Sequence, residues 1–180
     1  GIVNGSSWVQ LWSTYFGRKI VPGAQLINIG NEALQLNFMK AYQEGRVCPP
    51  QSNIDAFCRY TEDVLRLWPV DVLLLSCSTM NRAFQQVEDT VSDLRRLYDN
   101  IQTQVVQIDQ PMMETAVRHG GTTLVIATHG PTVQSTIELL EETAQKNQTE
   151  LKYEGDTVED AFELLGEGDI EGHNQVIADV

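Results

Sequence analysis

The chain has 180 residues, of which 42% are hydrophobic, and this is enough for one domain or for two small ones. Its formal net charge of −13 argues against nucleic acid and against an anionic membrane surface as partners, because both are bound through basic patches. No apolar run reaches the length of a membrane span, so we expect no membrane partner.

The cysteines limit the remaining chemistry. Cys48, Cys58 and Cys77 are widely spaced and odd in number, which is typical of a cytoplasmic protein with reduced thiols. They form no close pair with each other or with a histidine, so we expect no metal site. A small anionic ligand is compatible with the acidic composition, because a local cluster of N–H groups can bind it.

The first third of the chain alternates strand and helix patterns. Ser7 and Gln10 have the capping-box spacing that begins a helix, and Ser52 with Asp55 repeats that spacing. The later of these helices carries an apolar stripe that includes Cys58, so we interpret this cysteine as a core residue. The predicted elements are strands at residues 1–4 and 24–29, and helices at residues 8–16, at residues 34–43 and from residue 52 onward.

A short apolar run at residues 70–75 predicts a buried strand, which stops at Ser76-Cys77-Ser78-Thr79. The amphipathic pattern of residues 80–98 predicts a helix directly after this turn. Ligands bind at the carboxyl ends of parallel strands, and the N–H groups of a following helix favour anions there and lower the pKa of a thiol. The pattern therefore indicates a reactive Cys77, although a small buried core residue explains it as well.

The second half repeats the alternation. Residues 104–108 predict a strand, and Asp109 begins a short helix. A strongly apolar strand at residues 122–127 ends at Thr128-His129-Gly130-Pro131-Thr132, where Pro131 suits the first turn of the next helix. The remaining predictions are a brief strand at residues 151–153, a helix capped by Asp156 or Thr157, a loop at residues 166–172 and a last helix near His173.

The alternation of strand and helix predicts an α/β fold with mainly parallel sheets flanked by helices. A new strand–turn–helix series begins near residue 109, so we expect two similar domains at residues 1–108 and 109–180. The chain ends inside a helix-like pattern without a stop signal, and we therefore expect the second domain to be incomplete at its carboxyl end.

Polar turns at strand ends are the main functional signal. The chain lacks glycine-rich phosphate loops and the Gly-x-Ser-x-Gly elbow, so we expect no nucleotide or dinucleotide cofactor. Hydroxyl groups and helix amino termini suit a carboxylate ligand, whereas the same residues are also common as ordinary helix caps. The three turns contain Asn4, Ser6 and Ser7; Ser76, Ser78 and Thr79; and Thr128 and Thr132.

These stretches resemble the Asp/Glu/hydantoin racemase superfamily, which consists of cofactor-independent racemases and their relatives. The resemblance runs through nearly the whole chain and implies two similar α/β domains around a shared cleft. It also suggests a homodimer and no cofactor. The stretches that carry it are residues 1–7, VDVLLLSCSTMN at 70–81, QIDQPMMETAV at 107–117, TTLVIATHGPTVQSTIELL at 122–140, and the region of Gly168, Asp169 and His173.

The resemblance also implies a reaction. In that superfamily, two cysteines face the Cα atom of a carboxylate-bearing substrate, an amino acid or a hydantoin, and exchange its proton from opposite sides. Cys77 matches the first cysteine, and Ser78 and Thr79 match residues that hold the substrate carboxylate. The other expected substrate-binding residues lie on the equivalent turns and are Asn4, Ser6, Ser7, Thr128 and Thr132.

One departure from the superfamily's pattern leaves alternatives open. The second cysteine of the superfamily lies on a later strand, past the last helix of this chain, and neither Cys48 nor Cys58 is suitably placed. His129, at a strand end, is the expected substitute acid/base. The alternatives are a decarboxylase or cis–trans isomerase of the same superfamily, or a non-catalytic relative that keeps the carboxylate pocket.

Overall fold

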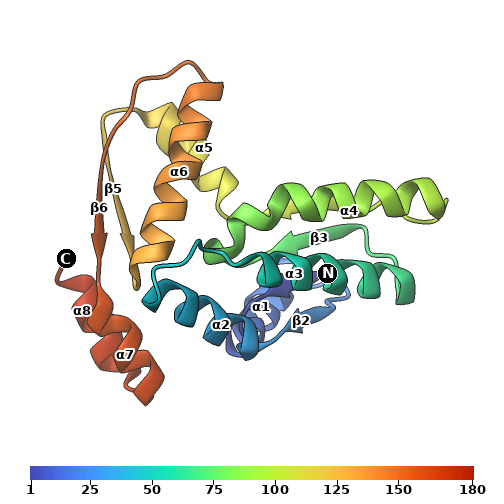
Figure 1. Cartoon of the computed structure of the whole chain (residues 1–180), viewed down its shortest axis with the longest axis horizontal. Helices are drawn as coiled ribbons and strands as arrows, with labels where there is room; N and C mark the ends of the chain where they lie inside the picture. Colours follow the sequence, from blue (N-terminus) through green and yellow to red (C-terminus); the bar gives the residue numbers. More distant parts are fainter. The chain divides into compact units, whose positions relative to one another are not determined.

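The computed structural model describes the backbone of residues 1–180 and all side chains except that of Trp8. The chain divides into two compact units, Gly1–Ile108 and Asp109–Val180, which we call the amino-terminal unit and the carboxy-terminal unit. Both consist of parallel strands and helices, so the expected α/β class is confirmed (Figure 1). That the units are two similar domains around a shared cleft stays a prediction.

Four parallel strands form the sheet of the amino-terminal unit. They are β1 (Ile2–Asn4), β2 (Asn28–Gly30), β3 (Val72–Leu75) and β4 (Gln104–Gln107), in the order β2-β1-β3-β4. From β1 the chain passes through α1 (Ser7–Ile20) to β2, and it returns through α2 (Glu32–Gln43) and α3 (Gln51–Leu67) to β3 on the other side of β1. The carboxyl ends of β1 and β3 therefore flank the crossover point, where such sheets bind ligands.

The alternation along the strands separates the two faces of this sheet. Asn28 and Gly30 face α1, and the Asn28 Nδ2 atom donates to Thr14 Oγ1 at 2.7 Å. α1 thus covers β1 and β2 from one side. The opposite face packs against α3 and α4 (Phe84–Leu97) in a core that includes Val3, Leu73, Leu75, Phe57, Leu65, Val87 and Val91.

The carboxy-terminal unit is built on a two-stranded parallel sheet. Its strands, β5 (Thr122–Ala127) and β6 (Lys152–Thr157), pair over their full length. α5 (Gln110–His119) and α6 (Gly130–Lys146) pack with this sheet around Val125 and Leu140. α7 (Glu159–Glu167) and α8 (Ile170–Ala178) follow β6 as a helical hairpin (Figure 1).

The helices begin at other residues than the predicted capping pairs indicate. Ser6, not Ser7, is the N-cap residue of α1, and Pro50 precedes α3. Neither capping box forms, because the Ser7 hydroxyl is bonded elsewhere and the extended Pro50, with its fixed φ, already sets the start of α3. A cap at Asp156 or Thr157 is also wrong, because β6 continues through both residues to pair with β5.

Two other predicted elements change length. The strand predicted at residues 24–29 is limited to Asn28–Gly30, because only these residues pair with β1. The loop predicted at residues 166–172 narrows to Gly168 and Asp169. Gly168 ends α7 with a φ of 86°, and the Asp169 side chain caps α8 by accepting from the Gly172 N–H at 2.9 Å.

The helix predicted at residues 80–98 is divided in two. It starts as a 3-10 helix, η1 (Ser78–Ala83), in which the Met80 N–H donates to the Cys77 carbonyl oxygen at 3.0 Å, and continues as α4. Hydroxyl and amide side chains disfavour a regular α-helix, and Ser78, Thr79 and Asn81 are all in this segment. The long α-helical amino terminus expected beside Cys77 is therefore absent, and an anion there gains less from aligned N–H groups.

Candidate functional site

Asn4 joins the carboxyl ends of β1 and β3. Its side chain is 2% exposed, and its Nδ2 atom donates to the Ser76 carbonyl oxygen and, at 3.1 Å, to Ser76 Oγ. Its Oδ1 atom accepts from the Ser6 N–H at 2.9 Å. Both ends of the amide are used within the protein, so Asn4 positions the two turns against each other. Its expected contact with a substrate stays a prediction.

Cys77 lies directly after this junction. Its side chain is half-buried, and its Sγ atom is 3.1 Å from Thr79 Oγ1. A Cβ atom placed at Gly5 would lie 3.6 Å from the same sulfur, so the thiol faces the end of β1 at a residue without a side chain. The geometry places a thiol at the carboxyl edge of the sheet, where ligands bind in folds of this kind. Like Cys48 and Cys58, Cys77 is partly buried against the core of this unit, and burial raises the pKa of the Cys48 thiol.

The start of α1 belongs to the same junction. Ser6 is 5% exposed, and its Oγ atom has no hydrogen-bond partner among the described residues. The Ser7 N–H donates to Glu32 Oε1 at 2.7 Å, and the Ser7 hydroxyl donates to the same oxygen. The Glu32 carboxylate therefore binds the Ser7 N–H and hydroxyl groups, which the sequence predicts to contact a substrate carboxylate.

The structure brings most of the expected residues of the amino-terminal unit to one sheet edge. Ser78 and Thr79 are half-buried in the first turn of η1, and the Thr79 hydroxyl is within hydrogen-bond distance of the Cys77 sulfur. Together with Asn4 and Ser6 they surround the crossover between β1 and β3. Ser7 is adjacent in sequence, but its side chain is bonded to α2.

The remaining expected residues gather at the carboxyl end of β5. His129 is the N-cap residue of α6, and its Nδ1 atom lies 2.8 Å from Thr132 Oγ1. Its ring lies 5.4 Å from that of Phe162, centroid to centroid, and half-buried Thr128 precedes it. Burial lowers the pKa of His129, which favours the neutral imidazole. A neutral imidazole can accept a proton, but the catalytic role of His129 stays a prediction.

The sequence gives no role to three residues of the crossover site: Gly5 and Ser76, which it places only in the polar turns, and Glu32. Gly5 and Ser76 lie inside the two polar turns, and their roles depend on which strands are neighbours. Glu32 follows the carboxyl end of β2, so the strand order would have placed it beside the first turn. A sequence that shows the turns but not the strand order does not reveal this contact.

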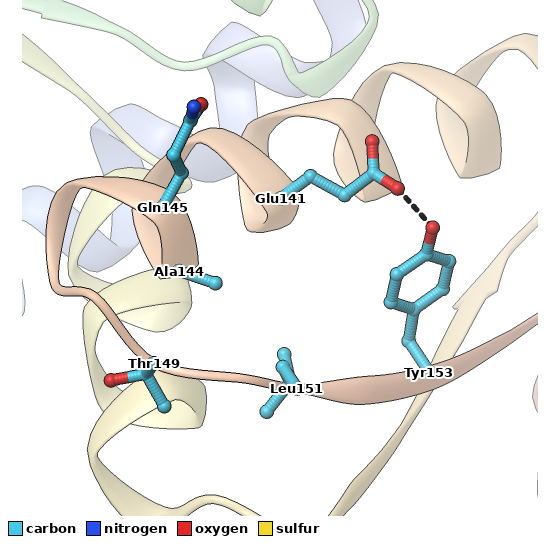
Figure 2. A pocket seen from close by; sticks show the side chains of 6 residues that line it. All are labelled: Glu141, Ala144, Gln145, Thr149, Leu151 and Tyr153. Atoms are coloured by element: carbon cyan, nitrogen blue, oxygen red, sulfur yellow. Dashed lines mark hydrogen bonds between the residues drawn. The ribbon is translucent and has the colours of Figure 1, made fainter.

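A separate hollow in the carboxy-terminal unit has a volume of about 370 Å³. Figure 2 shows it between α6 and the segment that leads into β6, with the Tyr153 hydroxyl donating to Glu141 Oε1 at one end. This hydrogen bond raises the pKa of Tyr153. The hollow lies near the amino end of β6, away from the strand ends that hold His129. Its lining residues are Glu141, Ala144, Gln145, Thr149, Leu151 and Tyr153.

Among the described side chains, no group of three or more His, Cys, Asp or Glu residues is arranged to hold a metal ion. Within the described chain, every helix is too short or too polar to cross a membrane. The sequence matches no known protein family model and no curated protein. Any functional assignment therefore depends on the site geometry and on the motifs that carry the resemblance.

Proposed function

We propose that this protein is a cofactor-independent racemase or epimerase. It moves the proton at the Cα atom of a small carboxylate-bearing substrate, of the amino-acid or hydantoin type, with Cys77 as acid/base. The observation that carries the proposal is the position of the Cys77 sulfur, beside Gly5 and 3.1 Å from Thr79 Oγ1 at the sheet crossover. The crossover is where a ligand binds in this kind of sheet, and a thiol there can reach it.

The proposed reaction begins when the Cys77 thiolate takes the proton from Cα and leaves the electron pair on the substrate. The pair is delocalised onto the carboxylate, and hydroxyl groups of Ser6, Ser78 and Thr79 stabilise the added charge. A proton returned from the opposite face gives inversion, whereas a proton returned by Cys77 gives exchange with retention. His129 stays the predicted residue for delivery from the opposite face.

A non-catalytic carboxylate-binding protein is the second candidate. It is favoured by a specific observation: Cys77 follows strand β3, whereas Cys48 precedes α3 and Cys58 lies on α3, so neither of them is at the end of a strand. Inversion needs an acid and a base on both faces of Cα. A protein of this second kind binds carboxylates but exchanges no Cα proton, so isotope exchange separates the two candidates.

The proposal includes a cytoplasmic location and a homodimer. A catalytic thiol must stay reduced, and the reducing cytoplasm provides that condition. The homodimer comes from the resemblance alone. Measurement of the molar mass in solution by light scattering tests it, and a monomer at micromolar concentration contradicts it.

Cys77→Ala is the variant that tests the proposed reaction. Wild-type protein is incubated with single enantiomers of amino acids and hydantoins, and with malonates and maleate, and chiral chromatography identifies the products. We expect racemisation to fall by about 10²-fold or more in Cys77→Ala, because a positioned acid/base contributes at that level. Cys58→Ala, on α3, is the matched control and retains activity. Racemisation that is undiminished in Cys77→Ala contradicts the proposal, and decarboxylated or isomerised products identify a different reaction.

A further inference from the structure

Glu32 places its carboxylate on the first residue of α1. Its Oε1 atom accepts from the Ser7 N–H at 2.7 Å and from the Ser7 hydroxyl. α1 has no acidic residue in its own first turn, so this acceptor comes from another helix, α2. The carboxylate group thus makes the two contacts that a bound carboxylate ligand would make at a helix amino terminus.

A second observation indicates that this location is a ligand subsite. Ser6 is the N-cap residue of α1, and an N-cap hydroxyl normally accepts from an N–H of the first turn. The Ser6 side chain makes no such bond, it is 5% exposed, and its Oγ atom has no hydrogen-bond partner among the side chains and backbone groups that the structure describes. A buried hydroxyl without a partner is unfavourable unless a ligand completes its hydrogen bonding. Through Asn4, the Ser6 backbone is fixed to the turn that carries Cys77.

Glu32 can leave Ser7 without loss of the helix that carries it. Glu32 is exposed, and α2 is capped independently by the Asn31 side chain, which accepts from the Ala33 N–H at 2.9 Å. The buried residues of α2 are Leu34, Phe38 and Ala41, and the first two belong to the core of the amino-terminal unit. Rotation of the exposed Glu32 side chain would vacate the Ser7 groups while the cap and the buried face of α2 stay in place.

We propose that Glu32 is an internal competitor, a specificity residue that fills the carboxylate subsite formed by Ser6 and Ser7 until a substrate carboxylate displaces it. This inference rests on the proposed function, because it assumes that the crossover site binds carboxylates. It adds to that function a residue that controls which carboxylates occupy the subsite. Weakly held anions remain excluded, and a substrate must supply further contacts at the Cys77 turn to compete.

The consequence is measurable as a change in carboxylate affinity. Without the internal carboxylate, a free carboxylate no longer competes with a tethered group. Hydrogen bonds to a charged group are strong enough for the dissociation constant of acetate to fall by roughly tenfold or more. Glu32→Gln keeps the size of the side chain and removes its charge, so its affinity for acetate should rise by part of the same factor.

The experiment uses the full chain and follows the Ser7 backbone amide by ¹⁵N NMR during titration with acetate. In Glu32→Ala, we expect a saturable shift of the Ser7 amide and a dissociation constant roughly tenfold or more below that of the wild type. Acetamide, the neutral analogue, should produce no saturable shift. Glu44→Ala, at the other end of α2, is the matched control for net charge and should bind acetate like the wild type.

The proposal is overturned if the Ser7 amide signal of Glu32→Ala shows no saturable shift with acetate. It is also overturned if Glu32→Ala and Glu44→Ala bind acetate with the same affinity. This outcome is distinguishable from failure of the proposed reaction, because the titration involves no proton transfer. If the wild type racemises substrates but the Ser7 amide of Glu32→Ala does not respond to acetate, only the proposed role of Glu32 as a competitor is wrong. If acetate binds at Ser7 in Glu32→Ala but no Cα proton is exchanged, the proposed competition by Glu32 holds and the proposed reaction is wrong.

Discussion

Asn4 links two turns that are more than 70 residues apart in sequence. Its amide donates to Ser76 after β3 and accepts from Ser6 after β1, and the side chain is almost fully buried. Because a buried amide without hydrogen-bond partners destabilises the folded protein, this network favours one arrangement of the two turns at the crossover. Cys77 gains its position from this arrangement, since it is the next residue after Ser76.

At the residue scale, His129 gives a prediction about pH and stability. Burial lowers its pKa in the folded protein, so the unfolded chain takes up a proton more readily as the pH falls. The stability associated with the neutral imidazole is present above the ordinary histidine pKa of about 6.5 and is lost as the pH falls through the lower, folded value. We expect His129→Gln to reduce the loss of stability between pH 7.5 and 5.5.

Urea unfolding at several pH values, followed by amide signals of the carboxy-terminal unit, measures this loss. His119→Gln is the matched control, because His119 is exposed at the end of α5. The prediction is wrong if His129→Gln and wild type lose the same stability on acidification, or if His119→Gln alone removes the effect.

At the element scale, the close approach of β6 to α6 depends on Gly155. A Cβ atom at this position would lie 2.7 Å from Val133 Cγ1 and 2.8 Å from Ile137 Cδ1. Gly155→Ala must therefore displace the Val133 and Ile137 side chains or the strand itself, and we expect a loss of about 1–3 kcal/mol in the free energy of unfolding, as for other overpacked sites. Thermal or urea unfolding of the variant measures it.

Gly166→Ala is the control for this glycine substitution. Gly166 lies inside α7 with nothing near its Cβ position, so alanine should be neutral or should stabilise by about 0.5–1 kcal/mol. Equal effects of the two substitutions would show that steric contact with α6 is not the cause of the Gly155 effect.

The elements are predictable from the sequence where the physical signal is local. Apolar runs identify β3 and β5, and the stripe of α3 identifies Cys58 as a residue packed on the core. Helix starts are less predictable, because capping depends on which side chain is free. The Ser7 hydroxyl bonds to Glu32 instead of capping α1, and this choice is made by a contact between distant residues.

At the scale of the whole molecule, the order of the strands in the sheet cannot be predicted from the local sequence pattern. The alternation of strand and helix predicts the α/β class, but the position of β1 between β2 and β3 follows from long-range pairing. That order brings the turns of Asn4 and Cys77 together and places Glu32 beside Ser7. The polar turns were therefore visible in the sequence, whereas the internal carboxylate was not.

The central claim is that Cys77 exchanges the Cα proton of a carboxylate-bearing substrate. Solvent exchange tests it more directly than racemisation, because exchange requires one base and inversion requires two groups. The chain is incubated in D₂O with each enantiomer of the substrate panel, and proton NMR follows the loss of the Cα–H signal. We expect exchange by the wild type and by Cys58→Ala, with a rate about 10²-fold or more lower in Cys77→Ala. Exchange at an undiminished rate in Cys77→Ala would contradict this claim.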